Sequence, residues 1–387
     1  MNSQDLYDFA PLARVLLTGA IIALGPIVWI WWRHRGATPL KRLQVLAVLT
    51  LFLSFDLVMF GAFTRLTDSG LGCPDWPGCY GSASPLGAHS EISAAQEAMP
   101  TGPVTHGKAW VEMIHRYLAT AVGGLIIVLT VSAWLRRRQG GPEPISPWWP
   151  TATLVWVLIQ GAFGALTVTM KLFPAIVTLH LLGGTVLLVL LCVQATRQTQ
   201  FADNLGLVPV SRALRYGMAV VALLVFVQVT LGGWVSTNYA VLACTTFPTC
   251  NGAWWPAMNF EGFQIWRALG FLPDGSHISF EALVAIHYVH RLFAYVAIAG
   301  LLWLGWRLRT VPGLAPQRRW LIGLTVLQFA TGLSNVVLDW PIVAAVLHTG
   351  GAAAIMVVLT WAWCSTKPET GRSVGHNTRR DTDRAVA

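Results

Sequence analysis

Nine stretches of the chain are almost continuously apolar, and polar segments separate them. A helix of about 20 apolar residues crosses the hydrocarbon core of a membrane. Helices also pair their own backbone polar groups, which favours them in lipid. We therefore expect nine transmembrane helices, at 12–32, 43–64, 109–135, 149–170, 174–196, 213–236, 282–306, 320–338 and 342–363.

The composition agrees with a membrane protein. Apolar residues make up 55% of the 387-residue chain and charged residues only 11%, whereas soluble domains carry about 25% charged residues. Tryptophan favours the membrane–water interface, and many of the 19 tryptophans lie near the ends of apolar runs. Examples are Trp31, Trp32, Trp134, Trp148, Trp149, Trp306, Trp320 and Trp340.

The net charge of +9 reflects membrane topology and does not indicate nucleic-acid binding. Lysine and arginine gather in alternate loops and in the C-terminal tail, which is the positive-inside pattern. We therefore expect a multi-pass protein of the bacterial inner membrane, with its N-terminus in the periplasm and its C-terminus in the cytoplasm. The basic residues are Arg33, Arg35, Lys41, Arg42, Arg136, Arg137, Arg138, Arg197, Arg212, Arg307, Arg309, Arg318, Arg319, Arg379 and Arg380.

The first apolar run is expected to be a retained helix. A signal peptide starts with a basic segment, but Asp5 and Asp8 precede this run and no convincing cleavage site follows it. At the other end of the chain, residues 366–387 are polar. Polar segments of this kind do not bury enough apolar surface to fold, so we expect a disordered cytoplasmic tail.

The chain contains two copies of one unit. Segments Gly61–Cys79 and Gly232–Cys250 close the second and sixth runs, and a shift of 171 residues superposes their first glycine, both cysteines and one proline. Each segment leads into a long loop and then into further matching helices. The later matches are Glu112-Met-Ile-His115-Arg116 with His287-Tyr-Val-His290-Arg291, and Pro174…His180 with Pro341…His348.

These matches predict an all-α integral membrane protein with one extra N-terminal helix and two parallel four-helix bundle repeats. An even number of spans separates equivalent points, so both repeats have the same orientation. A pseudo-two-fold axis along the membrane normal is expected for such a repeat. The predicted domains are 1–42 (extra helix and basic loop), 43–200 (first unit), 213–365 (second unit) and 366–387 (tail).

Four histidines lie at matching depth in the two units. Each stands six to nine residues from the periplasmic end of its helix, which is about 10 Å into the membrane. A lone histidine can simply bond a neighbouring helix, but two imidazoles at one depth suit axial ligation of a haem iron in a bundle. Two ligands are too few for a closed zinc site. We expect two haem sites, formed by His115 with His180 and by His290 with His348.

Glycines near these histidines are small enough for a flat macrocycle to approach the helix. Pairs of glycines follow His180 and His348 within one turn, and another pair follows His115 by two turns. Arg116 and Arg291 directly follow a histidine. Each arginine either pairs with a haem propionate, as guanidinium pairs well with carboxylate, or forms a structural ion pair.

The two units differ three residues before the first histidine. The first unit has Glu112 there and the second has His287. A carboxylate in lipid is costly, and a buried one can act as an acid or base. This difference suggests that one unit does chemistry while the other holds a permanent haem. His287 either pairs with a propionate or is a core residue.

Two cysteine pairs, Cys73 with Cys79 and Cys244 with Cys250, each enclose five residues of a periplasmic loop. The periplasm permits disulfides, and the spacing is not that of a zinc or thioredoxin motif. We expect two loop disulfides, which are structural unless the first pair relays electrons. Cys192 and Cys364 lie within helices and are expected to be core residues.

The residues of Thr64–Cys79, the sequence from Glu112 to Arg116 and the other three histidines resemble the haem A synthase family. The resemblance covers about residues 43–363. It implies an oxidoreductase of cytochrome oxidase biogenesis, which acts after haem O synthase and converts haem O to haem A. Two hydroxylations of the methyl group at porphyrin C8, followed by loss of water, give the formyl group.

The resemblance also assigns roles to the two units. His115 and His180, with Arg116, would bind the substrate haem O, and Glu112 would be the catalytic carboxylate. His290 and His348 would ligate a bound haem B, and Arg291 and His287 would contact that cofactor.

Two other functions are consistent with parts of the pattern. A non-catalytic di-haem cytochrome b would also need four histidines, but it explains neither Glu112 nor the cysteine loops. A transporter would explain the duplication, but few charged residues lie in mid-helix. The expected partners are haem O synthase, an electron donor or acceptor and membrane lipid. Small helix-facing residues also permit a homo-oligomer.

Overall fold

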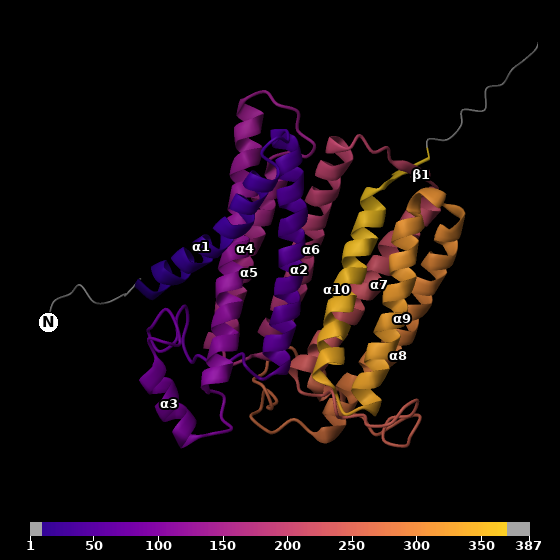
Figure 1. Ribbon diagram of the computed structural model, residues 1–387. Helices are drawn as coiled ribbons and strands as arrows, with labels where there is room; N and C mark the ends of the chain where they lie inside the picture. The colour runs from indigo at the N-terminus through magenta and orange to yellow at the C-terminus, as the bar shows by residue number, and fades with distance from the viewer. Residues whose placement is uncertain (1–9, 370–387) are drawn as a thin grey trace, which may run out of the picture.

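The computed structural model describes residues 10–369, and this part of the chain is mostly helical (Figure 1). The α-helices are α1 (Ala10–Arg33), α2 (Pro39–Leu66), α3 (His89–Ala98), α4 (His106–Arg138), α5 (Trp148–Thr169), α6 (Pro174–Ala202), α7 (Arg212–Thr237), α8 (Phe280–Arg307), α9 (Ala315–Val337) and α10 (Ile342–Cys364). Short 3₁₀ helices are η1 (Phe260–Phe263), η2 (Leu308–Thr310) and η3 (Pro312–Leu314), and the strands are β1 (Val208–Val210) and β2 (Thr366–Pro368).

Within residues 10–369, nine helices are long and apolar enough to cross a membrane. They are all of the α-helices except α3, so the prediction of nine spans is confirmed. Hydroxyl side chains begin several of them: the side chains of Thr38, Thr105, Ser211 and Ser279 each accept a hydrogen bond from a backbone N–H of the first turn. Such caps satisfy backbone groups that the helix itself leaves unpaired.

The short strands correct one prediction. Residues 366–368 were expected to belong to a disordered tail, but they form β2, which pairs in parallel with β1. The prediction is wrong for these three residues because their backbone pairs with a strand more than 150 positions away in the sequence. Residues 1–9 and 370–387, including Arg379 and Arg380, lie outside the described residues.

The long helices form two groups that lie side by side (Figure 1). In the first group α2, α4, α5 and α6 contact one another in a closed ring, and in the second α7, α8, α9 and α10 do the same. The groups meet where α2 packs on α10 and α6 packs on α7 and α10. Both cysteine segments and α3 lie at one end of the molecule, which we call the cysteine-loop end (Figure 1).

Two hydrogen bonds at this junction join residues that are equivalent in the two units. Arg65 Nη2 donates to the carbonyl oxygen of Ser236 at 2.6 Å, and the Tyr239 hydroxyl donates to Oδ1 of Asp68 at 2.7 Å. Each pair is separated by 171 residues. Equivalent residues of two repeats can contact each other only near the two-fold axis that relates the repeats. The contacts therefore support the expected pseudo-two-fold axis, which stays a prediction.

The extra helix α1 packs along α4 of the first unit. The two helices can approach closely because Gly19 has no side chain; a Cβ atom at this position would overlap the side chain of Thr120. Close packing of small residues is what associates helices in lipid. Val15 of α1 also joins the buried cluster that contains Cys73 and Cys79. The extra helix therefore helps to cover the first cysteine loop.

Candidate functional site

Each of the four histidines predicted to bind iron faces a glycine on a neighbouring helix of the same four-helix group. The four histidines lie on α4, α6, α8 and α10, and their side chains are partly buried. Their rings pack against α2, α5, α7 and α9, where the absence of a side chain leaves room for the imidazole. In the first unit, a Cβ atom added at Gly61 would lie 3.0 Å from a ring atom of His115, and one added at Gly164 would lie 3.4 Å from a ring atom of His180. In the second unit, a Cβ atom at Gly232 would lie 2.9 Å from the ring of His290, and one at Gly332 would lie 3.1 Å from the ring of His348.

The two imidazoles of each predicted pair lie near one another. His115 interacts electrostatically with His180, and His290 with His348. In the described part of the chain, no group of three or more His, Cys, Asp or Glu side chains is arranged to hold a metal ion. A pair of imidazoles needs a ligand that brings its own donors, as the porphyrin of a haem does.

The imidazoles therefore fit a haem in each unit. The donor set supports this fit, because each unit brings two imidazoles together and each ring lies against a glycine of the facing helix. Iron ligation by the four histidines stays a prediction.

Two of the glycines that follow the histidines lie against a glutamine. The side chain of Gln160 fills the space beside Gly183, and that of Gln328 fills the space beside Gly351. The expectation that these glycines leave room for a macrocycle stays a prediction. They allow a glutamine of the neighbouring helix to lie against the helix that carries the histidine.

Glu112 and Arg116 form a buried ion pair that holds the first cysteine loop. Oε1 of Glu112 accepts a hydrogen bond from Nη2 of Arg116 at 2.5 Å, and Oε2 accepts one from the backbone N–H of Cys73 at 2.8 Å. Arg116 also donates to the carbonyl oxygens of Pro77, at 3.1 Å, and Gly78. The carboxylate is only 4% exposed, so the pair is shielded from water.

The second unit builds the same connection without a carboxylate. His287 is buried, and its Nδ1 lies 3.0 Å from the carbonyl oxygen of Ala240. Arg291 donates to the carbonyl oxygens of Thr246 and Thr249 at 2.8 and 2.9 Å. The contacts of His287 are those of a core residue, which is one of the two alternatives for it.

These contacts bear on the two interpretations of the arginines. Arg116 has the partner that a structural ion pair requires, whereas Arg291 is held by backbone oxygens and by His287, whose Nε2 lies 3.4 Å from Nη2. Binding of a haem propionate by either arginine stays a prediction.

Both expected disulfides are present, between Cys73 and Cys79 and between Cys244 and Cys250. Each of these cysteines is at most 1% exposed. Labile disulfides are commonly strained or exposed, so this burial favours the structural interpretation over electron relay. The two remaining cysteines, Cys192 and Cys364, are free and buried, as expected for core residues.

Sequence reasoning missed two polar neighbours of the second histidine pair. Nε2 of Gln228 lies 3.1 Å from Nδ1 of His290, and Oγ1 of Thr331 lies 3.0 Å from Nδ1 of His348. A signal for the glutamine is present in the sequence. Glutamine stands four residues before the glycine that faces a histidine on α5, α7 and α9, at positions 160, 228 and 328.

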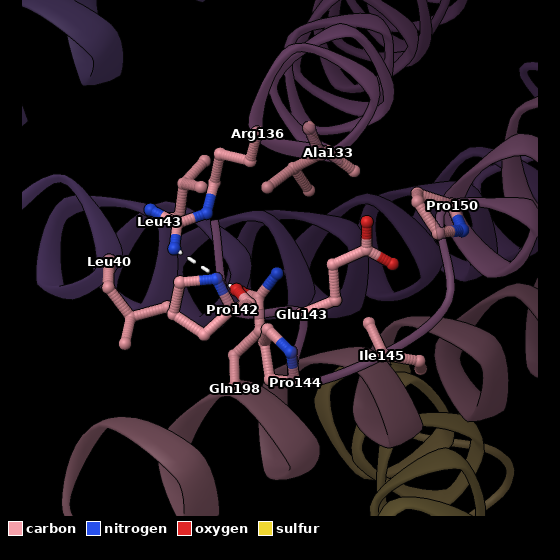
Figure 2. Close-up of a pocket in the computed structure, with 11 residues that line it drawn as sticks. Leu40, Leu43, Ala133, Arg136, Pro142, Glu143, Pro144, Ile145, Pro150 and Gln198 are labelled. Atoms are coloured by element: carbon pink, nitrogen blue, oxygen red, sulfur yellow. Dashed lines mark hydrogen bonds between the residues drawn. The ribbon is translucent and has the colours of Figure 1, made fainter. Parts of the chain in front are cut away.

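A separate hollow lies at the end of the first unit opposite the cysteine-loop end (Figure 2). Arg136, Glu143 and Gln198 contribute its polar lining, and Arg136 donates to the carbonyl oxygen of Pro142 at 3.1 Å. None of the predicted site residues lines it, so it is distinct from the histidine sites.

Comparison with known proteins connects this arrangement to one family. The family model of the cytochrome oxidase assembly proteins, COX15-CtaA, matches residues 44–360. The match therefore covers nearly all of both units and leaves out the whole of α1.

Individual relatives agree with the family match. The chain is 39% identical to "Heme A synthase" of Shewanella oneidensis over 325 residues, which cover 80% of this chain and 92% of that protein. It is also 28% identical to "Heme A synthase" of Sinorhizobium medicae over 359 residues, which cover 84% of this chain and 90% of the relative. A third protein of that name, from Alkalihalophilus pseudofirmus, is 28% identical over 56% of this chain and 67% of its own length.

Proposed function

This chain belongs to the COX15-CtaA family of cytochrome oxidase assembly proteins, and on that premise we propose how it acts. It is a haem A synthase, because it is 39% identical to a protein of that name and covers 92% of its length. Its substrate is haem O. The observation that carries the mechanism is the presence of two imidazole pairs, of which only the first has a buried carboxylate one helical turn away.

The proposed reaction oxidises the methyl group at porphyrin C8 of haem O to a formyl group. Two successive hydroxylations convert the methyl group to an alcohol and then to a diol, and loss of water from the diol leaves the aldehyde. The protein is accordingly an oxidoreductase that acts on a C–H group. Its product, haem A, supplies cytochrome c oxidase.

The two units divide the work. His115 and His180 hold haem O in the first unit, and His290 and His348 ligate haem B in the second. When bound, haem B supplies one-electron transfer. This division is supported by the place of Glu112, which lies three residues before His115 and so faces nearly the same side of α4.

Glu112 is the proposed catalytic carboxylate. Both of its oxygens are held, one by Arg116 and the other by the backbone N–H of Cys73. A carboxylate fixed in this way keeps its orientation and can accept a proton from a substrate hydroxyl group or balance a positive charge beside it. Arg116 is proposed to contact haem O, and Arg291 and His287 to contact haem B.

The proposed location is the bacterial inner membrane. The alternation of basic loops supports a periplasmic N-terminus, a periplasmic cysteine-loop end and a cytoplasmic C-terminus. Haem O synthase is the proposed source of the substrate. Each hydroxylation replaces a C–H hydrogen by a hydroxyl group and removes two electrons from the substrate, so the reaction needs a source of the oxygen atom and a separate electron carrier.

Identification of the bound haems tests the function. The protein should be purified from cells that make haem O, and its haems should be extracted and separated by chromatography. We expect haem B together with haem O or haem A. Haem B alone at both sites would instead identify an electron carrier.

The variant Glu112→Ala tests the mechanism. It should retain haem B and stop haem A formation, because the second unit does not contact Glu112. Normal haem A production by this variant would remove Glu112 from the mechanism.

A further inference from the structure

The two units differ in the hydrogen-bonding partners of the Nδ1 atoms of their histidines. In the second unit, Nδ1 of His290 lies 3.1 Å from the amide of Gln228 on α7. Nδ1 of His348 lies 3.0 Å from the hydroxyl of Thr331 on α9. Both imidazoles of this unit therefore have a hydrogen-bonding partner on the facing helix.

Among the described residues of the first unit, no side-chain amide or hydroxyl group bonds to either imidazole, although the ring of His180 interacts with the backbone of Gln160 on α5. Nδ1 of His180 is buried without a hydrogen-bond partner. The ring of His115 lies parallel to Phe60, with ring centroids 6.4 Å apart and an angle of 10° between the planes. Its neighbours on α2 are thus an aromatic ring and the glycine backbone at 61.

The repeat shows which residues cause this difference. A shift of 171 positions places Leu57 of α2 at the position of Gln228, and a shift of 168 positions places Phe163 of α5 at the position of Thr331. Both shifts superpose the glycines that face the histidines. Two polar anchors of the second unit therefore correspond to two apolar side chains in the first.

The Thr331 anchor suits a histidine that binds iron through Nε2, because Nδ1 then carries the ring proton. The hydroxyl of Thr331 donates to the carbonyl oxygen of Leu327 at 2.8 Å, which leaves its oxygen free to accept the Nδ1 proton of His348. Oε1 of Gln228 is buried and lacks a partner. Its amide nitrogen donates to the backbone carbonyl oxygen of His290 at 3.2 Å and lies 3.1 Å from Nδ1 and 3.5 Å from Nε2 of the ring, so Gln228 fixes the place of this imidazole from α7.

We infer that Gln228 and Thr331 are positioning residues that make the second unit retain its haem, and that Leu57 and Phe163 make the first unit exchange its haem. This inference rests on the proposed function. A cofactor must stay through every turnover, whereas a substrate haem must enter and its product must leave. Outer partners of a metal-binding histidine typically strengthen binding about 10- to 100-fold.

The Thr331 anchor also affects the electronic state of the ligand. A hydrogen bond from Nδ1–H makes the imidazole more basic, and a more basic ligand favours ferric iron. Loss of Thr331, whose oxygen can accept the Nδ1 proton of His348, should therefore raise the midpoint potential of haem B. A residue that only packs the helices would not change this potential.

The test compares haem loss from purified proteins to an excess of apomyoglobin, followed by absorbance. Gln228→Leu and Thr331→Val remove one anchor each while keeping an apolar side chain of similar size. Both should lose haem B about 10- to 100-fold faster than the wild type, and Thr331→Val should also have a higher midpoint potential. Gln194→Leu is the matched control, because Gln194 is 1% exposed on α6 and its amide has no hydrogen-bond partner.

The reciprocal variant tests the first unit. The double variant Leu57→Gln with Phe163→Thr should release its haem to apomyoglobin more slowly than the wild type. If Gln228→Leu does not accumulate in the membrane, Gln228→Met keeps the length of the side chain without the amide and is measured in the same way.

Rates within twofold of the wild type in both anchor variants and an unchanged midpoint potential in Thr331→Val would overturn this inference. So would equal acceleration in Gln194→Leu. Failure of the proposed function has a different signature, namely a wild-type protein that purifies without haem B. A wild type that carries haem B and makes haem A, alongside anchor variants that retain haem normally, refutes only the inference.

Discussion

Replacement of Arg116 by methionine should destabilise the protein far more than the same replacement of Arg291. Methionine keeps much of the arginine stem and removes the guanidinium. At Arg116 this leaves the Glu112 carboxylate without its ion-pair partner, and the two side chains are only 9% and 6% exposed. At Arg291 the guanidinium bonds to carbonyl oxygens and to the neutral ring of His287, so the change leaves no buried carboxylate without a partner.

The magnitudes follow from this difference. Removal of one member of a buried ion pair costs about 3–5 kcal/mol, because the other charge stays buried without compensation. Hydrogen bonds that involve a charged group contribute about 1.5–3 kcal/mol. Both variants lose bonds to loop carbonyl oxygens, so these losses largely cancel in the comparison. We therefore expect Arg116→Met to lower the free energy of unfolding by about 3–5 kcal/mol more than Arg291→Met does.

A double-mutant cycle with Glu112→Gln measures the pair directly. The double variant buries neither charge, so it should be less destabilised than the sum of the single variants, by about 0.5–3 kcal/mol. The assay is reversible unfolding of the purified protein in mixed micelles, followed by circular dichroism. Equal destabilisation by Arg116→Met and Arg291→Met, with no coupling in the cycle, would refute the reasoning.

Three further outcomes are expected. His290→Ala should abolish the haem B spectrum, and retention of that spectrum would reassign the ligands. Gly232→Leu should displace the ring of His290 and reduce haem B content, because even a Cβ atom there would lie 2.9 Å from the ring; Gly323→Leu, where nothing lies within 4 Å, should retain haem. A thiol reductant should leave the disulfides Cys73–Cys79 and Cys244–Cys250 intact in the folded protein, since these cysteines are at most 1% exposed. Mass spectrometry of alkylated samples checks this, and rapid reduction of either disulfide would contradict it.

The ends of the spans follow closely from the apolar runs, since lipid thickness determines helix length. The sequence also indicates the cysteine pairs, because five residues between two cysteines allow a local loop to close. The ion pair between Glu112 and Arg116 could have been found as well, since residues four apart lie on one face of a helix.

Contacts between distant segments could not be found in this way. Strand β2 forms only because β1 lies beside it, and neither three-residue segment has an apolar period that predicts a strand. The junction pairs Arg65 with Ser236 and Asp68 with Tyr239 depend on how the two units meet. The role of Gln228 depends on the rotation of α7 against α8, which brings its amide to the ring of His290.

The order of apolar and polar residues alone determined that this chain has nine membrane-length helices, a duplicated unit and four histidines at matching depth. Those features arise from helix geometry and lipid thickness, which act along the chain. The tertiary structure alone decided which atoms surround each imidazole and which loop each arginine holds. Hydrogen bonds require atoms within about 3 Å, and only the packing of helices from different parts of the chain brings those atoms so close.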